Sequence, residues 1–221
     1  MVFGKIEYLN LLPFHIFMKR FIRHSRLKQS MNYYQGVPSN INQKFLTKKV
    51  DAAFISSIKS KKCKSPKLGI IAKKDVKSVL VIPNHKKKRD IESATSNVLA
   101  EILQINGEII IGDKALKYAL KNDNYIDLAR QWHKKYNLPF VFATLCFNKN
   151  YKIFKSIEKN FGCKKYKIPS YLLKKASQKS QISQKEILNY LDLISYKIDK
   201  KAQNSIKRFL KLAKDTKSTI L

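Results

Sequence analysis

The sequence predicts an α/β fold that is divided into two lobes. Short apolar runs of strand length alternate with amphipathic stretches, a pattern typical of strands joined by crossover helices in a parallel or mixed sheet. Strongly apolar strands are predicted around Val79 and Val141, and the sequence between them contains further predicted strands and helices. We therefore expect mixed sheets, a first lobe of residues 1–80 plus 146–221, a second lobe of residues 81–145, and a hinge of two crossing strands. A single doubly wound domain is the alternative that this pattern leaves open.

Composition limits the class of protein. The 221 residues are 44% hydrophobic and include only six Gly and six Pro, so the chain can form a core and is neither disordered nor collagen-like. No apolar run approaches the length of about 18 residues that crosses a membrane. Three scattered cysteines and the lack of a secretory signal pattern predict a reduced protein of the cytoplasm.

The net charge is strongly positive. Lys and Arg number 46 against 15 Asp and Glu, which gives +31 and favours an anionic partner. Only six of the basic residues are Arg, the residue preferred for base readout and phosphate clamping, and the lysines are spread over the whole chain. We therefore expect no nucleic-acid partner, with a charge-driven nucleic-acid-binding protein as an alternative.

The first half of the chain alternates between strands and helices. Phe3–Asn10 alternates apolar and polar residues as a strand does, and Pro13 suits the first turn of a helix. Ser39 or Asn40 is expected to cap the next helix, Ile41–Lys48. Further strands are expected at Met31–Tyr34, Val50–Ile55, Leu68–Ala72 and Lys77–Ile82.

The second half is richer in helices. Ser93, Thr95 and Ser96 precede the periodic apolar run Val98–Ile105 and mark a helix start. The remaining expected elements are the strands Glu108–Ile111 and Pro139–Phe147 and the helices Ala115–Leu120, Asp127–Lys135, Phe154–Phe161, Ser170–Lys179, Ser183–Tyr196 and Asp199–Ala213.

Polar residues stand where predicted strands end, the edge at which open α/β sheets place their ligands. Asn10 lies between the first strand and a helix, and its amide can both donate and accept hydrogen bonds. Ser56 and Ser57 close a later strand, and Asp113 follows another as a candidate acid, base or orienting group. All four are also common turn or capping residues, so that structural role stays open.

The helix that begins after Ser93 is a second candidate site. Backbone amides at a helix N-terminus, with the hydroxyls of Thr95 and Ser96 beside them, bind carboxylate or phosphate. Simple capping is the alternative. We expect no metal and no organic cofactor, because Walker and Gly-rich nucleotide motifs are absent and metal-ligand spacing is lacking among the four histidines, His15, His24, His85 and His133.

Seven blocks in order resemble one protein family, the menaquinone-biosynthesis proteins of the futalosine route. The resemblance spans nearly the whole chain and is weakest after Tyr151. The blocks are Lys5–Pro13, Gly36–Asn40, Asp51–Ser57, Lys77–Val81, Ser93–Ser96, Ile109–Leu116 and Leu138–Ala143.

One block distinguishes two branches of that family. Ile111–Leu116 reads Ile-Gly-Asp-Lys-Ala-Leu, which resembles the chorismate dehydratase branch. The other branch, which opens cyclic dehypoxanthine futalosine, has Ile-His-Glu there and uses the His as a base, whereas this chain has Gly112. The resemblance implies a type II periplasmic-binding-protein fold and a lyase that dehydrates chorismate, a small dianion, to 3-[(1-carboxyvinyl)oxy]benzoate. A non-catalytic solute-binding or sensor protein of the same fold is the alternative.

The resemblance also implies roles for single residues. Asn10 would position the substrate, and Asp113 would either orient groups or transfer a proton. One departure is Leu145, where many members have a Trp, so an aromatic contact is expected to be missing. The two carboxylates would be held by Ser56, Ser57, Thr95 and Ser96, with Ser78 a weaker candidate. Neither a membrane nor a particular oligomeric state is implied.

Overall fold

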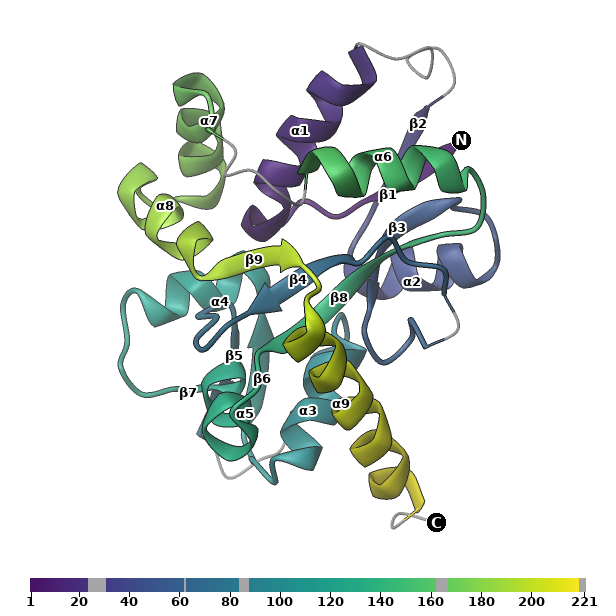
Figure 1. The fold of residues 1–221 in the computed structure, drawn as a ribbon. Coiled ribbons are helices and arrows are strands. Elements are labelled where there is room, and N and C mark those ends of the chain that lie inside the picture. Colours follow the sequence, from purple (N-terminus) through teal and green to yellow (C-terminus); the bar gives the residue numbers. More distant parts are fainter. Residues whose placement is uncertain (24–30, 62, 84–87, 162–166, 219–221) are drawn as a thin grey trace.

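The computed structural model describes residues 1–23, 31–61, 63–83, 88–161 and 167–218 (Figure 1). Its strands are β1 (Val2–Lys5), β2 (Asn32–Gln35), β3 (Ala52–Ser56), β4 (Leu68–Ala72), β5 (Val79–Ile82), β6 (Glu108–Ile111), β7 (Ile126–Asp127), β8 (Phe140–Phe147) and β9 (Ile194–Lys197). Its helices are the 3-10 helix η1 (Leu9–Leu11) and α1 (Leu12–Arg23), α2 (Pro38–Leu46), α3 (Ala94–Ile102), α4 (Gly112–Ala119), α5 (Leu128–Tyr136), α6 (Tyr151–Phe161), α7 (Ser170–Ser180), α8 (Gln184–Asp192) and α9 (Lys200–Ser218).

The strands form two mixed or antiparallel sheets, which confirms the α/β class predicted from the sequence. The larger sheet has the order β2-β1-β3-β8-β4-β9 and the smaller one β6-β5-β7. β1 pairs in parallel with β2 and β3, whereas β8 runs antiparallel to β3 and β4. β3 and β4 are buried along their whole length, as their uninterrupted small and apolar sequences predict for strands covered on both faces.

Aromatic side chains pack the helices onto the larger sheet. Figure 1 shows α1 and α6 together above this sheet and α9 below it. Phe14 of α1 lies edge-on to Phe54 of β3 and to Phe161 of α6, with ring centroids 4.9 and 5.1 Å apart. Trp132 of α5 contacts Phe140 of β8 and donates a hydrogen bond from Nε1 to a serine of α9 at 3.0 Å. These contacts fix the strand ends that carry the site.

Two passages of the chain join the sheets. Residues 73–78 lead from β4 to β5, and α5 leads from β7 back to β8. The predicted lobe boundaries, 1–80 plus 146–221 and 81–145, stay a prediction.

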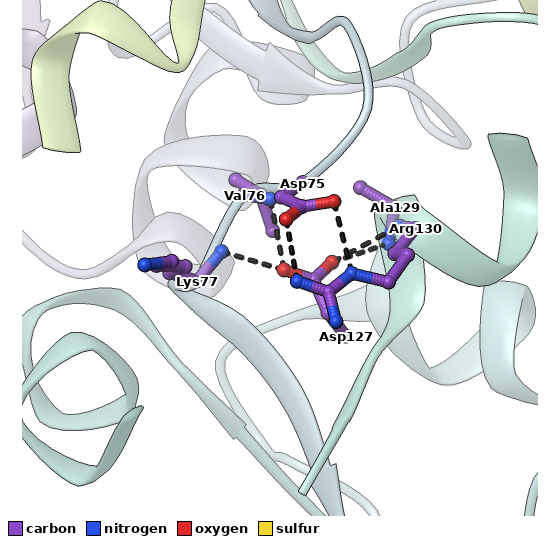
Figure 2. Close-up of polar contacts among 6 residues, drawn as sticks. All are labelled: Asp75, Val76, Lys77, Asp127, Ala129 and Arg130. Carbon is purple, nitrogen blue, oxygen red and sulfur yellow. Dashed lines mark hydrogen bonds and ion pairs between the residues drawn. The ribbon is translucent and has the colours of Figure 1, made fainter. Parts of the chain in front are cut away.

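A buried carboxylate fixes the first passage to the smaller sheet (Figure 2). Asp127 is 2% exposed and accepts hydrogen bonds from the backbone N–H groups of Val76 and Lys77 at 2.9 and 2.8 Å. Its other oxygen caps α5 by accepting from two N–H groups of the first turn. Arg130 of α5 binds Asp75 with Nε and Nη2 at 3.0 and 2.5 Å. Burial raises the pKa of Asp127, and the Arg130 hydrogen bond lowers that of Asp75.

Three element boundaries predicted from the sequence are wrong. The first strand ends at Lys5, and Asn10 lies in η1. α2 begins at Pro38, because proline's fixed φ suits the first helical position. Neither Ser39 nor Asn40 is therefore the N-cap of this helix. α4 begins at Gly112 and includes Asp113, whose carboxylate favours a first helical turn.

The predicted helix over residues 183–196 is also wrong. α8 ends at Asp192, and β9 follows it, pairing antiparallel with β4 at the edge of the larger sheet. Pairing with the edge of β4 therefore outweighs the helical pattern of the sequence after Asp192. Ser93 does cap α3, accepting from the N–H of Ser96, as the sequence predicts.

Candidate active site

A cavity lies where the two sheets face each other. Elements far apart in sequence line it: the β1–η1 segment, the end of β3, the middle of β4 and β8, the passage into β5, and the first turns of α2, α3 and α4. Its lining residues are Ile6, Tyr8, Asn10, Leu11, Pro38, Phe54, Ser56, Ile70, Val76, Ser78, Val79, Ser93, Ser96, Ile111, Gly112, Phe142 and Ala143. The walls are therefore apolar, with a small number of amide and hydroxyl groups.

Asn10 is the most distinctive polar group of the cavity. The hydroxyl of Tyr196 donates to its main-chain oxygen at 2.7 Å. Among the described residues, its Oδ1 atom is buried without a hydrogen-bond partner. Because an unpaired buried carbonyl is costly, this atom is poised to accept a hydrogen bond from a ligand.

Tyr190 holds the hydroxyl of Ser78, another lining residue. The phenol is 3% exposed, and its hydroxyl donates to Ser78 Oγ at 2.8 Å. Burial raises the pKa of Tyr190, so the hydroxyl keeps its proton at neutral pH. Tyr190 and Tyr196 were both missed from the sequence, because their helix and strand were predicted as one packing helix.

Helix starts give the cavity its electrostatic character. Ser93 and Ser96, in the cap and first turn of α3, line the cavity with their hydroxyl oxygens 2.6 Å apart. Pro38 and Gly112 place the first residues of α2 and α4 on the same wall. No Lys, Arg or His side chain is among the described lining residues. Negative charge would thus be held by helix dipoles and hydroxyl groups, not by ion pairs.

The serine that closes β3 is held by a second asparagine. Asn42 of α2 donates from Nδ2 to Ser56 Oγ at 2.8 Å and accepts from the Ser56 N–H at 3.0 Å. Both groups are buried, which fixes the direction of the serine. Since Ser56 Oγ accepts from Asn42, its own proton can be donated to a ligand in the cavity.

The predicted site residues divide into two groups. Asn10, Ser56, Ser78 and Ser96 line the cavity, whereas Ser57, Thr95 and Asp113 do not.

The residues outside the lining bind the backbone. Ser57 Oγ donates to the main-chain oxygen of Val141 at 2.6 Å, and Thr95 Oγ1 accepts from the N–H of Ile58 at 3.3 Å. Leu145 is buried and also lies outside the lining, and Phe142 supplies an aromatic wall from the same strand.

Asp113 supports the segment that carries Asn10. Its Oδ1 accepts a hydrogen bond from the N–H of Leu9 at 3.0 Å. Burial raises the pKa of Asp113. This contact ties α4 to the segment that carries Asn10.

Tyr8 and Gly112 form one side of the cavity. The Tyr8 hydroxyl donates to Glu92 Oε2 at 2.6 Å, which joins the β1–η1 segment to the loop before α3. Gly112 has φ +67°, and a Cβ there would lie 2.8 Å from the Tyr8 ring. A side chain at position 112 is therefore excluded by both backbone and ring.

Other sites are not indicated in the parts of the chain that the structure describes. They contain no group of three or more His, Cys, Asp or Glu side chains placed to hold a metal. None of their helices has the length and apolar character needed to cross a membrane. Two of the histidines, His24 and His85, lie outside the described residues.

The two sheets with a cavity between them form a periplasmic-binding-protein fold. AF1704 from Archaeoglobus fulgidus has this arrangement with a TM-score of 0.71 at 8% identity, covering 98% of this chain and 97% of that one. The alkanesulfonate-binding protein SsuA from Xanthomonas axonopodis pv. citri, bound to MOPS, has a TM-score of 0.66 at 9% identity, covering 98% and 93%. The fold that the sequence resemblance implied is confirmed.

Sequence comparison identifies the family. The chain belongs to the menaquinone biosynthesis family, whose model matches residues 1–107 and 96–215. A chorismate dehydratase from Campylobacter jejuni subsp. jejuni serotype O:23/36 (strain 81-176) is 45% identical over 218 residues, covering 97% of this chain and 98% of that protein. The resemblance to the chorismate dehydratase branch is confirmed by this relative.

Proposed function

We propose that this protein is a cytoplasmic chorismate dehydratase, which removes water from chorismate to give 3-[(1-carboxyvinyl)oxy]benzoate for menaquinone synthesis. The observation that supports this most is the 45% identity to a chorismate dehydratase along nearly the whole of both chains. A cavity that holds negative charge by helix starts and hydroxyls, with one unpaired amide oxygen, suits a small dianion that also carries a hydroxyl group.

The reaction requires little chemistry from the protein. The ring proton at C3 is acidified by the neighbouring double bond that is conjugated to the ring carboxylate. Removing this proton and the C4 hydroxyl makes the ring aromatic, and together they leave as one molecule of water. Orientation, stabilisation of charge and exclusion of bulk water are therefore the main contributions of the site.

The lining residues take complementary roles. Asn10 Oδ1 accepts from the C4 hydroxyl, and Ser56 and Ser96 donate to the carboxylates from β3 and α3. Thr95 and Ser57 do not contact the substrate. Their hydroxyl groups form hydrogen bonds with the backbone and hold the segments that carry the lining residues. Asp113 orients the Asn10 segment and does not transfer a proton, because it bonds Leu9 and lies outside the lining.

The base is a group of the substrate. No carboxylate or imidazole is among the described lining residues. A His at position 112, the base implied for the related branch, would collide with Tyr8. The enolpyruvyl carboxylate of chorismate itself therefore takes the C3 proton and passes it to the departing hydroxide, without a metal or an organic cofactor.

A second candidate is a binding protein without turnover, which the fold shared with SsuA favours. Incubation of the purified protein with chorismate, followed by ultraviolet absorbance and mass spectrometry, separates the two. Formation of the aromatic ether supports the dehydratase. Chorismate that binds in a calorimeter but is recovered unchanged supports the binding protein.

A further inference from the structure

Asn42 is the polar member of an otherwise apolar helix face. The buried residues of α2 are Ile41, Asn42 and Phe45, and Asn42 is 5% exposed. A buried amide is costly unless it is hydrogen-bonded, and both ends of this one bind the same residue, Ser56 at the end of β3. Ser56 lines the cavity, whereas Asn42 is not among the lining residues. The amide can therefore act on a ligand only through Ser56.

The two hydrogen bonds fix the direction of the Asn42 amide and of the Ser56 hydroxyl. A backbone N–H can only donate, so the group 3.0 Å from the Ser56 nitrogen must be the amide oxygen, Oδ1. The other end of the amide is then Nδ2, which lies 2.8 Å from Ser56 Oγ and can only donate to it. The hydroxyl oxygen is thus an acceptor on the Asn42 side, and the hydroxyl proton takes no part in either bond.

We propose that Asn42 is a positioning residue that makes the Ser56 hydroxyl a donor toward the cavity, where it meets a carboxylate oxygen of the substrate; this rests on the proposed function. A free serine hydroxyl rotates and can offer a ligand either its proton or its lone pairs. With Nδ2 on one side of Oγ, the proton is left for the cavity that Ser56 lines. The site thereby selects a group that accepts hydrogen bonds, such as a carboxylate, over one that donates them.

The direction of this hydroxyl matters because the cavity has little else to offset negative charge. No Lys, Arg or His is among its described lining residues. A reversed hydroxyl would turn oxygen lone pairs toward a carboxylate, and no cationic side chain of that lining would compensate for the repulsion. A donor that is oriented before the ligand binds also has no reorganisation to undergo. Asn42 therefore contributes to binding of the anion without touching it.

Asn42→Asp tests this direction in the full-length protein, because aspartate has two acceptor oxygens and no amide proton. One oxygen still accepts from the Ser56 N–H, and the other accepts the Ser56 hydroxyl proton, which reverses the hydroxyl. With chorismate as substrate, we expect KM to rise about 10- to 100-fold and kcat to change less than about threefold, because the lost bond is shared by ground state and transition state. Asn40→Asp makes the same change of charge at an exposed position of α2 and should leave KM within about twofold.

Ser56→Ala separates the direction of the hydroxyl from the added charge. This variant keeps the backbone N–H that Asn42 binds but has no hydroxyl to reverse, and alone it should raise KM about 10-fold. In its background, Asn42→Asp should raise KM at least about fivefold less than it does in the wild type, since only the charge remains. A purely structural role of Asn42 would instead give the same loss in both backgrounds.

A second readout needs neither ligand nor turnover, and it replaces the kinetics if Asn42→Asp does not fold. In the ¹⁵N–¹H spectrum of the wild type, the backbone N–H of Ser56 and a side-chain N–H of Asn42 should both exchange slowly with solvent. Ser56→Ala should speed exchange of the Asn42 side chain and leave the backbone N–H at position 56 slow, because only the bond to Oγ is lost.

Two kinds of result overturn the proposal. A KM of Asn42→Asp within about twofold of the wild type, or a loss that is equally large in the Ser56→Ala background, refutes the role of the hydroxyl. Fast exchange of the Asn42 side chain in the wild type, or exchange that Ser56→Ala leaves unchanged, refutes the hydrogen-bond direction. If chorismate binds without turnover, its Kd from calorimetry takes the place of KM. If it neither binds nor reacts, the proposed function fails, and exchange alone decides the direction.

Discussion

Asn10→Ala should separate catalysis from stability. The substitution removes a buried oxygen that has no hydrogen-bond partner in the described residues, which relieves a cost of about 1–3 kcal/mol. The free energy of unfolding should therefore stay within about 1 kcal/mol of the wild type or increase. For a chain of this size that is a change in Tm of about 2–4 °C. Turnover should fall about 10²- to 10³-fold, as for loss of an oriented hydrogen-bonding group at a reacting oxygen.

Asn42→Ala is the matched control, because both ends of this buried amide are bonded to Ser56. Its loss leaves a buried N–H without an acceptor and should cost about 2–4 kcal/mol, or about 5–15 °C in Tm. Thermal unfolding of the ligand-free proteins and the chorismate assay give both quantities. If Asn10→Ala lowers Tm as much as Asn42→Ala does, or keeps turnover within about threefold, Asn10 is a structural residue and the proposed role is refuted.

Three further predictions concern the framework of the site. Asp127→Ala removes the acceptor of four backbone N–H groups and should lower the free energy of unfolding by about 3–5 kcal/mol in urea titrations, with exposed Asp123→Ala as a neutral control. Burial lowers the pKa of His15 from 6.5 to about 4, so the unfolded state binds the proton more readily than the folded state. As the pH falls from 6.5 to 4, the free energy of unfolding should therefore decrease by up to about 3 kcal/mol. The free energy of unfolding of His15→Gln should depend less on pH. Gly112→Ala should cost about 1–3 kcal/mol and reduce turnover, because it strains a left-handed residue and displaces Tyr8; wild-type activity would contradict the packing.

The parts of the site that depend on local rules could be predicted from the sequence. Ser56 stands at a strand end, Ser96 in the first turn of a helix, and Asn10 in the 3-10 helix that leads into α1; the sequence places polar groups at such positions near a sheet edge. Their neighbours Ser57 and Thr95 satisfy the same local rule, yet their side chains bind backbone. Sequence alone does not distinguish them. Which of two neighbouring side chains faces the cavity depends on how the strand or helix is turned in the fold.

The contact that holds the Asn10 main chain could not be predicted, because it comes from Tyr196, far along the chain. Tyr190 lies on α8 and Tyr196 on β9, and the turn between them was predicted as continuous helix. That turn exists because β4 has an edge that β9 can pair with, a tertiary effect that outweighs helical propensity. Pairing at this edge brings the Tyr196 hydroxyl to the main chain of Asn10. The Asn10 segment and the α8–β9 segment are thus held together, because the sheet edge at which β9 pairs also places the Tyr196 hydroxyl on the Asn10 main chain.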